Sequence, residues 1–180
     1  MRSIIFGLFC IAIGLASCKS GQSVVSTQEK LLVTKVIEQQ QFKIESNWAY
    51  PQTTNALQQV MNAGLIPPGS SASAISLVGH PNFVILKGDS ISSYLPYFGE
   101  RQMQIAYNGS DSAVQFKGVV EDYAITKDKK SRYTISFRAT SNTERFDVMI
   151  TLFPNATARI YLNSASRFPI SYAGKLTAED

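Results

Sequence analysis

Cysteine is scarce in this chain, and its position is as informative as its number. The two cysteines, Cys10 and Cys18, both lie at the extreme N-terminus of the 180 residues. Because no thiol follows residue 18, a disulfide framework and a cysteine metal cluster are excluded. The single histidine, His80, excludes most histidine-rich metal sites as well. We therefore expect no metal and no cofactor.

Net charge is also small. Charged residues make up 17% of the sequence and hydrophobic residues 44%, which is an ordinary globular composition. If the first 17 of the 180 residues are removed, 163 remain, with 16 basic and 13 acidic side chains and a net charge of +3. A charge this weak does not indicate a nucleic-acid partner unless it is clustered.

A hydrophobic run of transmembrane length is missing at the N-terminus. The uncharged segment Ile4–Ala16 follows Arg2 and is shorter than the roughly 20 residues that a membrane-spanning helix needs. Its length and position are typical of the core of a signal peptide.

The segment ends in Leu15-Ala16-Ser17-Cys18, which resembles the bacterial lipobox. The resemblance implies that Cys18 is acylated, with palmitate-type chains, and becomes the new N-terminus; a plain secretory peptide is the alternative. More than one acyl chain makes such anchoring stable. Because Lys19 rather than aspartate follows, and no acidic cluster comes next, we expect the periplasmic side of the outer membrane. The expected divisions are a signal peptide (1–17), a lipidated tether (18–25) and one domain (26–180).

The start of the domain shows helix signals. Ser26 and Glu29 have the spacing of a capping box, which predicts a helix over about 27–40. A second short helix is expected around Asn55–Asn62. Between them, Phe42–Tyr50 alternates like a strand, with Phe42, Ile44, Trp48 and Tyr50 expected on one face.

From Ile75 onward the pattern is one strand after another. Gly88-Asp89 predicts a two-residue hairpin turn, and a change of phase near Gly118 predicts a bulge. The short turns favour antiparallel neighbours. We expect an α+β fold that is mainly antiparallel β: a strongly bent sheet or partly open barrel of about 8–9 strands with one or two N-terminal helices. The expected strands include 83–87, 90–95, 101–107, 113–126, 133–138, 145–152, 158–163 and 170–172.

The sequence shows no catalytic constellation. His80 lies in a predicted turn, and the neighbouring carboxylates Glu121 and Asp122 would point to opposite faces of a strand. The basic run 127–130 is most simply a solvated hairpin turn. We therefore expect a protein that is not an enzyme and does not bind nucleic acid.

The unusual segment is Tyr94–Gly99, which holds three aromatic residues, Pro96 and a glycine. It is either an aromatic plug that closes one end of the sheet or a rigid platform for a ligand. We expect Phe98 to belong to the plug and Tyr97 to be partly exposed, because its hydroxyl needs water or a polar partner.

This segment, Tyr94-Leu95-Pro96-Tyr97-Phe98-Gly99, also carries a family resemblance, together with Ser166-Arg167-Phe168-Pro169-Ile170-Ser171-Tyr172-Ala173-Gly174. Both resemble the domain-of-unknown-function 4251 family of Bacteroidetes lipoproteins, over roughly residues 42–176. The resemblance supports an envelope location and one β-rich domain, and it implies no activity or ligand. Tyr172 and Gly174 join the candidate binding or structural residues on this ground.

Two tripeptides resemble the O-glycosylation sequon of that phylum. They are Asp89-Ser90-Ile91 and Asp111-Ser112-Ala113, and both fall at predicted turns. Ser90 and Ser112 are therefore candidate glycosylation sites.

Together these features predict a non-catalytic lipoprotein of the cell envelope that binds a ligand or another envelope component, whether protein, glycan or lipid. Two alternatives remain open. One is a periplasmic inhibitor that inserts an aromatic loop into an enzyme, and the other is a glycan- or peptidoglycan-acting hydrolase with paired carboxylates.

Overall fold

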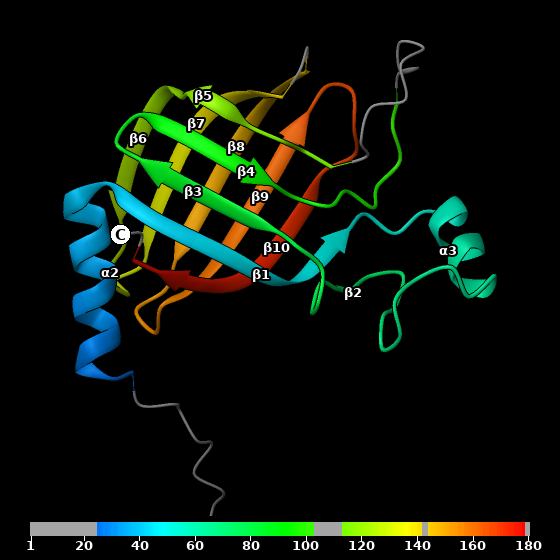
Figure 1. Cartoon of the computed structure of the whole chain (residues 1–180), viewed down its shortest axis with the longest axis horizontal. Helices are drawn as coiled ribbons and strands as arrows, with labels where there is room; N and C mark the ends of the chain where they lie inside the picture. Colours follow the sequence, from blue (N-terminus) through cyan, green and yellow to red (C-terminus); the bar gives the residue numbers. More distant parts are fainter. Residues whose placement is uncertain (1–24, 103–112, 142–143, 179–180) are drawn as a thin grey trace, which may run out of the picture.

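A computed structural model describes residues 25–102, 113–141 and 144–178 (Figure 1). The described part holds two helices and ten strands. The helices are α2 (Thr27–Gln39) and α3 (Asn55–Asn62). The strands are β1 (Gln41–Pro51), β2 (Ile75–Ser76), β3 (Phe83–Lys87), β4 (Ser90–Tyr94), β5 (Lys117–Val119), β6 (Glu121–Lys127), β7 (Tyr133–Ser141), β8 (Glu144–Leu152), β9 (Thr157–Ser164) and β10 (Ile170–Thr177).

All ten strands belong to one antiparallel sheet. Its order is β5-β4-β3-β1-β10-β9-β8-β7-β6, and the short β2 pairs with β1 beside this path. The two edge strands, β5 and β6, are consecutive in the chain, so the sheet curls until its edges approach each other. The result is a nearly closed barrel with one unsealed seam, which confirms the expected fold class (Figure 1).

The first helix begins where the sequence predicted. The Glu29 amide donates to Ser26 Oγ at 3.1 Å, and the Ser26 amide donates to Glu29 Oε2 at 2.9 Å, so the capping box is complete. Gln40 ends the helix with a left-handed φ of 50°. The buried side chains of α2, Val33 and Val36, pack onto the barrel near the start of β1.

The predicted long strand over 113–126 is divided into two. Gly118 has a φ of 142°, and the amide of Val120 donates to the carbonyl of Asp89. On either side of this break, β5 pairs with β4 and β6 pairs with β7. Gly118 itself pairs in register with Ile91, so the predicted bulge is not at this residue; the chain passes from one edge of the sheet to the other at Val120, and the register shift lies between Glu121 and Ala124 of β6. Most of the strand expected over 101–107 lies outside the described residues.

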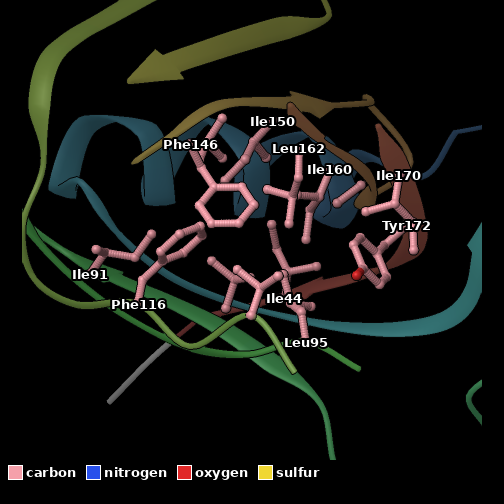
Figure 2. Packing of buried hydrophobic residues seen from close by; sticks show 14 of the residues in the cluster. Ile44, Ile91, Leu95, Phe116, Phe146, Ile150, Ile160, Leu162, Ile170 and Tyr172 are labelled. Atoms are coloured by element: carbon pink, nitrogen blue, oxygen red, sulfur yellow. The ribbon is translucent and has the colours of Figure 1, made fainter. Parts of the chain in front are cut away.

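The barrel interior is filled by apolar side chains from two facing walls (Figure 2). Ile44, Ile91 and Phe116 come from one wall, and Phe146 and Ile160 come from the other. The rings of Phe116 and Phe146 meet edge to face, with centroids 5.5 Å apart. Burial of this cluster is the main source of the domain's stability.

The expectation for Trp48 and Tyr50 is wrong. The pairing of β1 with β10 shifts register between Ser46 and Trp48, and this bulge reverses the faces of the residues that follow. Both aromatic side chains consequently lie half-buried on the outside of the barrel, while Ala49 takes the inner face.

A glycine on the neighbouring strand makes the bulge possible. Gly174 lies opposite Ser46, and a Cβ at Gly174 would stand 2.6 Å from the Cα of Ser46 and would overlap the carbonyl oxygen of Glu45. Only a residue without a side chain lets the two backbones approach this closely.

Candidate functional site

Tyr97 is the buried centre of the aromatic segment. Its side chain is 7% exposed, and its hydroxyl lies 2.9 Å from the carbonyl oxygens of both Glu100 and Phe168. Phe98 is only half-buried against the core. The expected order of burial is therefore reversed, because the protein itself supplies acceptors for the tyrosine hydroxyl and lets the whole ring be buried.

Tyr172 connects the two family-like segments. Its ring is fully buried, and its hydroxyl donates to the carbonyl of Pro96 at 2.9 Å. Burial raises the pKa of Tyr172 far above its usual range and raises that of Tyr97 to about 12, in spite of the nearby guanidinium of Arg167. The segments around Tyr97 and Tyr172 therefore pack against each other at one end of the barrel.

Arg167 completes this arrangement. It is 4% exposed, and its Nε and Nη2 atoms lie 2.7 Å and 2.6 Å from Glu144 Oε2. Its guanidinium also lies 4.9 Å from the ring centroid of Tyr97. The other carboxylate oxygen of Glu144 accepts from Ser166 Oγ at 2.5 Å. We refer to Tyr97, Glu144, Arg167 and Tyr172 as the motif cluster.

Burial alone would raise the pKa of Glu144, but the hydrogen bonds from Arg167 and Ser166 outweigh it and hold this pKa below its usual value. The side chains of the motif cluster thus find their hydrogen-bond partners inside the protein, either in one another or in neighbouring backbone carbonyls and Ser166. This arrangement is what a structural closure of the barrel end requires, since a binding site needs groups that face a ligand.

The remaining residues of the segment serve this packing or lie beside it. A Cβ at Gly99 would overlap the hydroxyl of Tyr97, so the glycine keeps room for that ring. Tyr94 is half-buried and pairs across the strands with Phe83, where both rings border a shallow hollow on the outside of β3 and β4. The structure therefore brings Pro96, Tyr97, Gly99 and Tyr172 together and leaves Tyr94 apart.

Two carboxylates next to each other on β6 are paired with arginines. Asp122 forms an ion pair with Arg138, and Glu121 lies 3.5 Å from Arg145, all on the outer surface. Across residues 25–102, 113–141 and 144–178, no group of three His, Cys, Asp or Glu side chains could hold a metal ion. In the same residues no helix has the length and hydropathy of a membrane span.

The candidate modification sites are placed only in part. Ser90 is exposed at the start of β4, and its hydroxyl lies 3.5 Å from the carbonyl of Gly118. Ser112 and Cys18 lie outside the described residues. His80 is exposed in a turn, and 127–130 passes from the end of β6 into a hairpin turn, as the sequence indicated.

The outward turn of Trp48 creates a different candidate site. Beside its indole lies a hollow of about 380 Å³, formed by β1, β9, β10 and the turn before β9. We name it the Trp48 hollow. Its polar lining consists of two amides, a hydroxyl and two cations: Asn47, Asn155, Thr157, Arg159 and Lys175.

More aromatic surface adjoins the Trp48 hollow. The guanidinium of Arg159 lies 5.9 Å from the ring centroid of Tyr50. The strand register then places Tyr161 and Met149, which are 38% and 45% exposed, on the same outer face as Tyr50. Trp, Tyr, Met and Arg are the side chains most enriched where proteins make contacts.

This surface could not be predicted from the sequence, because unbroken alternation of inward and outward side chains along β1 would place Trp48 and Tyr50 inside the barrel. The sequence feature that pointed to the bulge was Gly174, since a glycine inside a strand often marks a close approach of two backbones. Connecting Gly174 with Ser46 requires the β1–β10 register, which the sequence does not display.

The fold defines a nearly closed, antiparallel β-barrel with a helix at its start. The family model described as "Domain of unknown function (DUF4251)" matches residues 25–176, and the chain belongs to this family. A crystal structure of a DUF4251 family protein from Bacteroides eggerthii DSM 20697 is similar in fold, with a TM-score of 0.56 and 16% sequence identity. The match covers 87% of this chain and 92% of that one. No curated protein matches the chain.

Proposed function

We propose that this protein is a non-catalytic, lipid-anchored component of the bacterial outer membrane that binds an envelope saccharide in the Trp48 hollow. The observation that carries the binding proposal is the bulge in β1, which turns Trp48 outward beside five polar side chains. A bulge that re-aims a side chain is a feature that folds keep for a purpose.

The chemistry of the Trp48 hollow suits a sugar. A sugar ring has an apolar face of C–H groups, which stacks on an indole, and a rim of hydroxyls, which both donate and accept hydrogen bonds. Asn47 offers a donor and an acceptor. Asn155 Oδ1 already accepts from the hydroxyl of Thr157 at 2.7 Å, which leaves the Asn155 side-chain amide as a donor and the Thr157 oxygen as an acceptor, while Arg159 and Lys175 add donors. A hollow of about 380 Å³ also lies within the usual range for small-ligand sites.

The anchor part of the proposal rests on the lipobox. Serine in place of Cys18 cannot form the thioether with the diacylglyceryl group. We expect Cys18→Ser protein to accumulate uncut or to be released in soluble form, as shown by membrane fractionation and mass spectrometry of the N-terminus. Cutting at the same bond with retention in the membrane would contradict lipidation.

The binding part is tested with the protein's own fluorescence. Trp48 is the single tryptophan of the chain, so its emission reports directly on the proposed site. We expect a saturable change in emission when oligosaccharides released from the bacterial envelope are added. Asn155→Ala and Arg159→Ala should weaken this response about tenfold or more, since each removes hydrogen-bond partners of the ligand.

A matched control lies in the separate hollow beside β3 and β4. Phe83→Ala also removes an aromatic ring from a surface hollow, but it leaves the Trp48 hollow intact, so its saccharide response should match the wild type. Equal weakening in Phe83→Ala and Arg159→Ala would contradict binding in the Trp48 hollow. No saturable response to any envelope saccharide would contradict the saccharide proposal itself.

The two alternative functions receive less support. The inhibitor hypothesis needs a protruding Tyr97–Phe98 loop, whereas Tyr97 is buried and hydrogen-bonded. The hydrolase hypothesis needs two carboxylates that face each other across a groove. Glu121, Asp122 and Glu144 instead face arginines.

A further inference from the structure

A second hollow lies beside α2, and its lining differs chemically from that of the Trp48 hollow. It measures about 420 Å³ and is bounded by α2, the β6–β7 hairpin and Pro154. Three lysines line it: Lys30 from α2, and Lys127 and Lys130 from the hairpin. Figure 1 shows α2 standing at the end of the barrel where β1 begins. We name this hollow the lysine pocket.

The lysine pocket carries a concentrated positive charge. None of its lining side chains is acidic, and among the described residues no carboxylate forms an ion pair with Lys30, Lys127 or Lys130. The nearby carboxylate of Asp128 is already held by Arg132, whose Nε and Nη2 atoms both lie 2.6 Å from it. Three lysines that line one pocket favour an anion with several oxygen acceptors, such as a phosphate group.

The hairpin that supplies two of the lysines is fixed in shape. The carboxylate of Asp128 accepts from the backbone amides of Lys130 at 2.8 Å and Arg132 at 2.9 Å. Ser131 takes a left-handed φ of 57° between them. The ammonium group of Lys127 is positioned 4.8 Å from the ring centroid of Tyr133. The hairpin backbone therefore needs little ordering when an anion binds.

The short distance along the chain between the pocket and Cys18 indicates which kind of molecule carries the phosphate. Val25 lines the pocket, and it follows Cys18 by seven residues. Seven extended residues reach at most about 25 Å. A lipid anchor at Cys18 would thus hold the lysine pocket within about 25 Å of the membrane surface, among phosphate-bearing headgroups.

We infer that the lysine pocket binds the phosphate headgroup of an anionic membrane lipid and so sets the orientation of the barrel on the membrane. The choice of a lipid as the source of the phosphate rests on the proposed anchor. The phosphate preference itself rests on the three lysines and the fixed hairpin.

The test uses the mature chain, residues 18–180 with Cys18→Ser, which has neither the hydrophobic signal peptide nor an acyl anchor, and measures its binding to vesicles. Phosphatidylcholine vesicles are compared with vesicles that also contain phosphatidylglycerol. We expect stronger binding to the anionic vesicles, and we expect the variant with Lys30→Gln, Lys127→Gln and Lys130→Gln to lose about tenfold or more of that binding, since each lysine near an anionic surface contributes to the attraction.

The matched control replaces three lysines outside the pocket, with Lys35→Gln, Lys87→Gln and Lys117→Gln. Both triple variants lose the same net charge, so an unspecific attraction to the surface would weaken equally in both. We expect the control to lose less than about threefold. Equal losses in the two variants, with melting curves that show both to be folded, would overturn the pocket.

A second arm distinguishes the source of the phosphate. Soluble glycerol phosphate is titrated into the same protein in the absence of vesicles, and binding is followed by calorimetry. We expect weak binding compared with the anionic vesicles. Binding as tight as that to the vesicles would overturn the membrane lipid as the ligand. Because this protein has no anchor, a failure of lipidation in cells would not affect either arm.

Discussion

Arg167 is, among the described residues, the one charged side chain that is almost fully buried. Its cost of burial is offset by Glu144, by the ring of Tyr97 and by the close packing around both. Arg167 lies in a family-like segment between β9 and β10, but the sequence does not reveal its role, because its partner Glu144 lies on β8. The importance of such a pair becomes visible only when the register is known.

Removal of Arg167 should strongly destabilise the domain. Arg167→Ala leaves Glu144 without its cation, and we expect the free energy of unfolding to fall by about 3 kcal/mol in chemical denaturation. Arg132→Ala is the control, because its ion pair with Asp128 is exposed to solvent and should contribute far less to stability. Equal losses in the two variants would contradict a structural role for the motif cluster.

The lowered pKa of Glu144 predicts an acid dependence. A carboxyl whose pKa is lower in the folded state stabilises the fold above its unfolded value of about 4.5. This contribution is lost as the pH falls below 4.5 and through the folded pKa. Glu144→Gln should therefore show a flatter decline of unfolding free energy over this pH range than the wild type. Parallel pH curves for the two proteins would contradict the prediction.

At the scale of elements, local signals predicted local structure. The capping box of α2 and the Gly88-Asp89 hairpin depend on residues that are neighbours in the chain, and both were confirmed. The face of Trp48 depends on Gly174, at the other end of the domain. The barrel could therefore be predicted from the sequence, but the candidate binding surface on its outside could not.

The contact between Gly174 and β1 predicts a sensitive position. Gly174→Ala places a methyl group against the backbone of Glu45 and Ser46, and we expect a loss of about 1–3 kcal/mol in unfolding free energy. The emission of Trp48 should change as well, since the bulge must shift. Lys175→Ala, on the same strand but exposed, should stay within about 0.5 kcal/mol. A Gly174→Ala protein with wild-type stability and emission would contradict this account of the bulge.

Two buried serines, one on β4 and one on β1, allow a matched comparison. The hydroxyl of Ser93 accepts from the amide of Phe116 at 2.9 Å, whereas the hydroxyl of Ser46 is buried without a hydrogen-bond partner. Ser93→Ala leaves a buried amide unsatisfied and should cost about 1–3 kcal/mol. Ser46→Ala should lower the free energy of unfolding far less, because the hydroxyl that it removes forms no hydrogen bond. Thermal or chemical denaturation of the two variants measures these losses. A larger loss in Ser46→Ala than in Ser93→Ala would contradict the prediction.

At the scale of the whole molecule, composition and alternation were enough to predict an antiparallel barrel, because each hydrophobic face must be covered. They did not show how the barrel closes. Along the described sheet, neighbouring strands are also neighbours in sequence, apart from the short β2, except where β1 meets β10. The seam lies instead between β5 and β6, in the middle of the chain.

This topology has a consequence for the timing of folding. A ribosome completes β1 before the other nine described strands and β10 after them, so the barrel cannot close until β10 has been synthesised. A circular permutant that opens between Val120 and Glu121 and joins the old ends keeps every pairing but makes β1 and β10 sequence neighbours. We expect it to fold faster than the natural chain in stopped-flow refolding, because its contact order is lower. A slower permutant of similar stability would mean that the pairing of β1 with β10 is not the step that limits folding.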